Sequence, residues 1–154
     1  FTEAMTGFEY TAAVGMLYED MTEEGLECIR IVRERYDGSR RNPFDEAECG
    51  HHYARAMASW AAVLALTGFR YSGVDKTIEF AATDETSRTF WSNGSAWGTL
   101  RQKPTAKGAK VELTVLHGKL TIRRFTLAGV GAVEMKRARS IGAGTTEVFK
   151  VSRG

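Results

Sequence analysis

The sequence predicts an α+β fold in which helices come first and an antiparallel sheet follows. Two observations support this order. Between Phe8 and Gly68, apolar residues recur at three- and four-residue steps, which is the period of an amphipathic helix. Beyond Gly73, apolar and polar residues alternate, which is the period of a strand. Helices and strands that are segregated along the chain in this way favour the α+β class.

Three helices are expected in the first half. The first runs from about Gly7 to Asp20. The second begins at Thr22, which we expect to cap it, and ends before Gly38. Asn42-Pro43 then interrupts the chain, because proline disfavours a helical conformation in the residue before it. The third runs from about His51 to Thr67, and its expected buried stripe is Tyr53, Met57, Trp60 and Leu64.

The second half is expected to form short strands. Residues 111–116 and 120–125 alternate on either side of Gly118, which predicts a β-hairpin with glycine in the turn. Further strands are expected at about Lys76–Phe80, Trp97–Leu100 and Thr145–Val151. The sequence therefore predicts a helical domain at 1–72 and an antiparallel β extension at 73–154.

Composition is that of a globular protein, with 43% hydrophobic and 26% charged residues among 154. No window approaches the roughly 18 consecutive apolar residues of a membrane span, so no integral membrane segment is expected. The chain opens without a signal peptide or an initiator Met, and we interpret it as part of a longer protein. A soluble protein is expected, with the cytoplasm as the favoured compartment.

Cysteine and histidine do not predict a metal centre. Cys28 and Cys49 are too few for a disulfide framework. The string Cys49-Gly50-His51-His52 lacks the second pair of ligands that a structural zinc site needs. We expect no metal and no organic cofactor.

Charge is unevenly distributed along the chain. Residues 1–75 carry 7 Lys/Arg and 13 Asp/Glu, a net charge of −6, whereas residues 76–154 carry 14 and 6, a net charge of +8. The plainer interpretation is an acidic part and a basic part that pack in one structure. The alternative is a non-catalytic binding module whose basic sheet engages nucleic acid or another anionic surface. The cations of that surface would be Lys103, Lys107, Lys110, Arg123, Arg124, Lys136, Arg137 and Arg139.

The densest polar chemistry precedes the third helix. Asp45, Glu46 and Glu48 lie within four residues, and Arg55 follows in the first turns of the expected helix. A carboxylate accepts hydrogen bonds from two sugar hydroxyls, and a guanidinium donates to hydroxyl oxygens. The same residues also suit a helix cap and a structural ion pair. From residue types alone, both interpretations stay open.

Several strings of the first half resemble the C-terminal end of glycoside hydrolase family 116, which contains non-lysosomal glucosylceramidases and bacterial β-glucosidases. The resemblance is collinear over roughly residues 3–72, and residues 90–98 are similar to the family's C-terminal extension. The matching strings are Met5-Thr6-Gly7-Phe8-Glu9-Tyr10, Glu23-Glu24-Gly25-Leu26, Arg33-Glu34-Arg35-Tyr36-Asp37-Gly38, Asn42-Pro43-Phe44-Asp45-Glu46-Ala47-Glu48-Cys49-Gly50 and Tyr53-Ala54-Arg55-Ala56-Met57-Ala58-Ser59-Trp60.

The resemblance implies a fold and an activity. The helices would be the last ones of an (α/α)6 toroid, followed by a small antiparallel β extension. The parent would be a retaining β-glycosidase acting on a β-glucoside or a glucosylceramide-like substrate, with no nucleic acid as partner. Glu46 and Arg55 match the family's sugar-binding Glu and Arg, Glu48 would support them, and Glu9 would approach the pocket. The family's Glu nucleophile and Asp acid/base lie upstream of this region, so no catalytic carboxylate is expected here.

Overall fold

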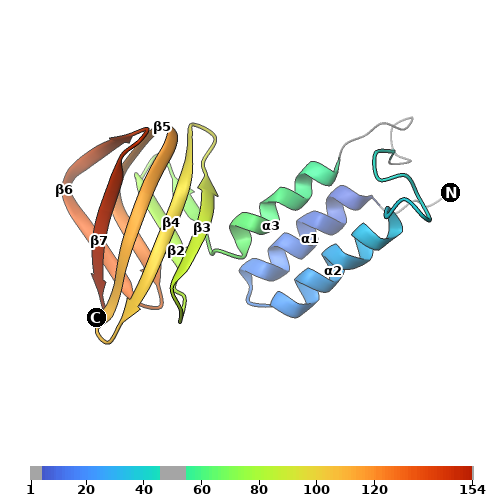
Figure 1. Ribbon diagram of the computed structural model, residues 1–154, viewed down its shortest axis with the longest axis horizontal. Coiled ribbons are helices and arrows are strands. Elements are labelled where there is room, and N and C mark those ends of the chain that lie inside the picture. The colour runs from blue at the N-terminus through green and yellow to red at the C-terminus, as the bar shows by residue number, and fades with distance from the viewer. Residues whose placement is uncertain (1–4, 46–54, 154) are drawn as a thin grey trace. The chain divides into compact units, whose positions relative to one another are not determined.

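The computed structural model of the chain describes residues 5–45 and 55–153, and for residues 55 and 56 it describes the backbone alone. The chain divides into two compact units, a helical unit that ends at Leu66 and a sheet unit that begins at Thr67 (Figure 1). The boundary precedes the predicted one after residue 72. The reason is that β1 (Arg70–Ser72) pairs with β2 (Thr77–Ala81) and belongs to the sheet unit.

Strands make up 46% of the structure and helices 26%. The expectation of terminal toroid helices followed by a small antiparallel extension is therefore wrong, since the sheet unit is the larger part. The physical reason is that the alternation of apolar and polar residues continues far enough along the chain to form seven strands, which bury a core of their own. The sheet is also mixed, because β2 pairs in parallel with β5 (Gly108–Ala128).

The helical unit contains α1 (Thr6–Tyr18), α2 (Thr22–Arg35), the 3-10 helix η1 (Arg55–Ser59) and α3 (Trp60–Ala65). The ranges of α1 and α2 agree with the predicted ones. After α1, Asp20 adopts a left-handed backbone, and the Met21 amide donates to the Met16 carbonyl at 2.9 Å, which satisfies one of the last carbonyls of the helix. The prediction that Thr22 caps α2 is wrong, because Thr22 is already helical and no side chain caps this helix.

The prediction that Met57 and Trp60 belong to a buried stripe is also wrong. Each of these side chains is 72% exposed. The helix instead buries Ala62 and Ala65, which pack with Leu17 of α1. Small side chains on this face allow α3 to approach α1 closely, and the large side chains remain exposed.

The sheet unit is organised around β5, a strand of 21 residues. Its first part pairs with β4 and β7, and its second part pairs with β2 and β6, so that the sheet curls into a half-barrel (Figure 1). The remaining strands, β1 and β3, pair with β2 and β4. The bounds not given above are β3 (Ser87–Ser92), β4 (Ala96–Thr105), β6 (Gly131–Gly142) and β7 (Thr146–Ser152).

The prediction of a hairpin around Gly118 is wrong, because residues 111–116 and 120–125 both belong to β5. Gly118 does have a positive φ of 76°, as a turn glycine would. The chain nevertheless keeps its direction: β4 pairs with β5 as far as Gly118, with a register shift between Trp97 and Gly98, and β6 pairs from Lys119 onward. The inward face of β5 therefore changes between Val115 and Leu120, and the chain does not reverse at Gly118.

The core of the sheet unit depends on the side chains of β5. Phe125 stacks on Phe149 of β7, with ring centroids 4.6 Å apart, and on Phe80 of β2 at 6.1 Å. The aromatic contacts thus join strands that pair with opposite parts of β5. Seven side chains of β5 are fully buried, namely Val111, Leu113, Val115, Leu120, Ile122, Phe125 and Leu127.

One prediction concerns the close approach of β4 to β5 at Gly98. A β-carbon at Gly98 would lie 1.9 Å from the carbonyl oxygen of Thr114. We expect Gly98→Ala to lower the free energy of unfolding by about 1–3 kcal/mol, because the backbone has to move to relieve the overlap. Urea denaturation followed by circular dichroism measures the change.

Gly142→Ala is the matched control. A β-carbon at Gly142 meets no atom within 4 Å, and its φ is not positive. The control is expected to stay within about 1 kcal/mol of the unsubstituted chain. Equal losses in the two variants would show that the close approach at Gly98 does not constrain the sheet.

Candidate functional site

The acidic motif, which we define as Asp45, Glu46 and Glu48, is flanked along the chain by two described segments of the helical unit. Before it, the Phe44 amide donates to Asn42 Oδ1 at 2.9 Å and the Asp45 amide donates to the Asn42 carbonyl at 3.2 Å. This local turn is one that Asn readily forms. After the motif, Arg55 is the first residue of η1. Glu46 and Glu48, together with Tyr53 and Cys49, lie outside the described residues.

Glu9, the fourth candidate sugar-binding residue, forms an ion pair with Arg35. One guanidinium nitrogen of Arg35 donates to Glu9 Oε1 at 2.9 Å, and the second donates to Oε2, so the pair is bidentate. The two side chains are 27% and 30% exposed, and the hydrogen bonds that Arg35 donates to Glu9 raise the pKa of Arg35. The pair joins α1 to the last turn of α2. Glu9 would therefore enter a sugar site only together with Arg35.

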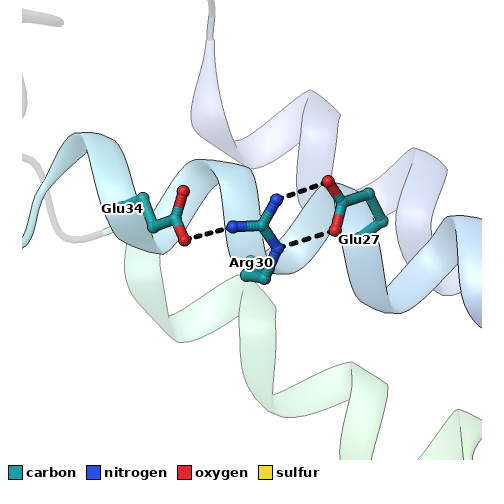
Figure 2. A network of polar contacts seen from close by, with 3 residues as sticks. All are labelled: Glu27, Arg30 and Glu34. Atoms are coloured by element: carbon teal, nitrogen blue, oxygen red, sulfur yellow. Dashed lines mark hydrogen bonds and ion pairs between the residues drawn. The ribbon is translucent and has the colours of Figure 1, made fainter.

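A second charged group lies along α2 and has a structural role. Arg30 donates through Nε to Glu27 at 2.7 Å and also binds Glu34, at i−3 and i+4 spacings on one exposed face (Figure 2). Hydrogen bonding to Arg30 lowers the pKa of Glu27. Neighbours at these spacings stabilise a helix modestly. The arrangement is typical of a solvated helix face.

Two aromatic side chains flank the acidic motif in sequence and are available for contact. Phe44 is 86% exposed, and Trp60, at the start of α3, is 72% exposed. An exposed ring can cover the apolar face of a pyranose. The sequence had instead predicted that Trp60 belongs to a buried stripe.

The cations of the sheet unit separate into paired and grouped side chains. Lys110 binds Glu112 at 2.8 Å and Arg139 binds Glu147 at 3.4 Å. Lys103 and Lys107 are exposed on β4 and on the turn that follows it. Five further cations line one surface hollow of about 660 Å³, which we call the basic hollow; its charged residues are Lys76, Arg123, Arg124, Lys136 and Arg137 with Asp75 and Glu134.

Lys76 is the residue of this group that sequence reasoning missed. It has a left-handed backbone with φ 58°, and its carbonyl accepts hydrogen bonds from the amides of Arg123 at 2.6 Å and Arg124 at 3.2 Å. The sequence did contain a signal for the irregularity in β5 that the Lys76 carbonyl contacts. Two adjacent arginines interrupt an alternating strand, and such an interruption is typical of a β-bulge.

The described part of the chain offers no metal cluster and no bilayer span. Among residues 5–45 and 55–153, no three His, Cys, Asp or Glu side chains gather as metal ligands would. No helix within these residues is long and apolar enough to cross a membrane.

Comparison with known proteins adds no relative. No protein-family model matches the chain, and no curated protein matches it significantly. The resemblance of residues 3–72 to a glycosidase family therefore stands on the matching strings alone.

The α2 network yields a prediction about pH. Because the pKa of Glu27 is lowered from 4.5, the interaction with Arg30 is present above that value and is lost as the pH falls through the lowered pKa. We expect Arg30→Gln to raise the titration midpoint of Glu27 toward 4.5. Side-chain carboxyl NMR measures both midpoints.

Asp37 supplies the control for this titration. Its pKa is lowered by hydrogen bonds from the side chain and amide of Ser39, both at 2.8 Å, and Arg30 is not among the causes. The Asp37 midpoint should therefore stay below 3.8 in the Arg30→Gln variant. A Glu27 midpoint that does not move when Arg30 is replaced would contradict the interpretation.

Proposed function

We propose that this chain contributes sugar-binding residues to a retaining β-glycosidase whose catalytic carboxylates belong to another part of the parent protein. The observation that carries the proposal is the collinear resemblance of residues 3–72, with Glu46 and Arg55 nine residues apart in its longest string. The substrate class is a β-glucoside, including glucosylceramide-like lipids. No metal or organic cofactor takes part.

The local structure around the motif supports the proposal. The Asn42 turn orders the chain before the motif, and η1 with α3 orders it afterwards. The burial of Ala62 and Ala65 against Leu17 anchors α3 to α1. A binding segment that is followed by a packed helix has less conformational entropy to lose when it binds a ligand.

The exposed surface of the helical unit supports a role inside a larger domain. One side of α1 is exposed and uncharged over two turns. A helix that is apolar or small on several sides is typical of a helix packed within a larger protein. The residues of this side are Phe8, Thr11, Ala12 and Gly15.

The chemistry assigned to Glu46 and Arg55 is recognition remote from the bond that is cleaved. A carboxylate and a guanidinium form charge-assisted hydrogen bonds with neighbouring hydroxyls. Such bonds raise the rate if they strengthen as the ring flattens toward the oxocarbenium-like transition state. Glu48 would orient this pair. Retaining hydrolysis also needs two carboxyl groups about 5–5.5 Å apart, and the proposal assigns neither of them to this chain.

The test is kcat/KM of the full-length parent on an aryl β-glucoside, compared with Glu46→Ala and Arg55→Ala. Loss of a desolvated charged partner costs about 2–5 kcal/mol, or roughly 30- to 4,000-fold in kcat/KM. Circular dichroism checks that each variant is folded.

Glu23→Ala and Arg33→Ala are matched controls, because both residues are exposed on α2 and lie outside the motif. They should retain kcat/KM within a few-fold. An active parent that tolerates Glu46→Ala and Arg55→Ala would reduce the motif to a helix cap and an ion pair. A wholly inactive parent would contradict the glycosidase proposal itself.

A further inference from the structure

We propose that the basic hollow of the sheet unit is a binding site for a phosphate or sulfate oxyanion. The hollow is built from the β1–β2 turn, the second part of β5 and the middle of β6. The inference rests on the backbone geometry and charge of these segments. It is independent of the glycosidase proposal, which concerns the helical unit.

The first step is the bulge in β5. Inward-facing side chains alternate up to Ile122 and resume at Phe125, so two residues stand between them where alternation allows one. Arg123 and Arg124 are consequently both exposed. A single acceptor, the Lys76 carbonyl, receives both of their amides, which fixes the extra residue in place. The backbone therefore holds Arg123, Arg124 and Lys76 next to one another.

The second step is the opposing irregularity in β6. Ile122 pairs with Arg139, but Arg124 already pairs with Glu134, so one residue of β5 faces residues 135–138 of β6. These four residues have no partner in the register of β6 with β5. Lys136 and Arg137 lie in this unpaired part of β6, are exposed, and line the hollow. β-Bulges are over-represented beside binding sites, where they re-aim side chains.

The third step is the charge balance. Five cations and two acids line the hollow, which leaves a net charge of +3. Glu134 binds Arg124 at 3.1 Å, and Asp75 accepts a hydrogen bond from Ser72 at 2.7 Å. In the described part of the chain, no ion pair engages the other four cations, which are Lys76, Arg123, Lys136 and Arg137. Their mutual repulsion favours an anion among them.

The ligand class follows from these groups. Guanidinium groups bind phosphate and sulfate oxygens through paired N–H donors, and lysine adds a mobile point charge. A lining with a net charge of +3 favours an oxyanion with more than one negative charge over a single carboxylate. Nucleic acid would need cations that continue along a strand of phosphates. Here Lys110 and Arg139, beyond the hollow, are already paired with glutamates.

The experiment measures binding of inorganic pyrophosphate to the full chain by isothermal titration calorimetry at low ionic strength. The test variant carries Arg123→Gln with Arg137→Gln, which removes one cation from each side of the hollow. Loss of charge-assisted hydrogen bonds should raise Kd about tenfold or more. The control variant carries Lys103→Gln with Lys107→Gln, which removes the same charge from exposed positions outside the hollow.

Binding that is weakened in the test variant and retained in the control supports the site. Absence of pyrophosphate binding, or equal weakening in both variants, overturns it. Vesicles of phosphatidylserine in phosphatidylcholine identify the source of the oxyanion. Vesicle binding that is lost in the test variant assigns a lipid headgroup. Pyrophosphate binding without vesicle binding assigns a soluble ligand. If a single-stranded oligonucleotide binds while pyrophosphate does not, and its affinity falls equally in both variants, a diffuse nucleic-acid surface would replace the proposed site.

Discussion

The sheet unit depends on one constraint, which is that a single long strand has to serve two different sets of partners. β5 pairs with β4 and β7 and then with β2 and β6, and it contributes more buried side chains to the core than any other strand. Strict alternation along 21 residues would keep one face inward throughout. The strand shifts its inward face twice, near Gly118 and at Arg123–Arg124, and so follows the curl of the sheet. The second shift also places cations on the outer surface.

The sequence predicted the elements whose pattern is local. α1, α2 and β7 follow from side-chain periodicity, which local contacts produce. The hairpin prediction failed because a positive φ at Gly118 is compatible with a turn and with a continuing strand, and the long-range pairing with β4 before it and β6 after it decides between them. The buried stripe of the third helix failed for a related reason. Ala62 and Ala65 are buried because α1 approaches α3, and a scale that ranks Met57 and Trp60 as more apolar does not contain that contact.

The candidate sites differ in how far the sequence defines them. The acidic motif was found from residue types and a family resemblance, and the structure describes its flanking turn and helix together with the Glu9–Arg35 pair. The basic hollow was anticipated only as a list of cations. Its grouping depends on the hydrogen bonds that the Lys76 carbonyl accepts from the amides of Arg123 and Arg124. Lys76 directly precedes β2, which pairs with β5, whereas the sequence predicted that residues 120–125 pair with residues 111–116 in a hairpin. Parallel pairing of β2 with β5 is a long-range feature that no local pattern specifies.

The Lys76 carbonyl fixes the register shift of β5, and amide hydrogen exchange measures its effect at Arg123. Arg123 lies outside the ladder that β5 forms with β6, so protection of its amide depends on Lys76. NMR-detected exchange should show Arg123 protected to the same degree as the paired amides of β5. Exchange of the Arg123 amide at the rate of an unstructured chain, beside protected neighbours, would contradict this role of the Lys76 carbonyl.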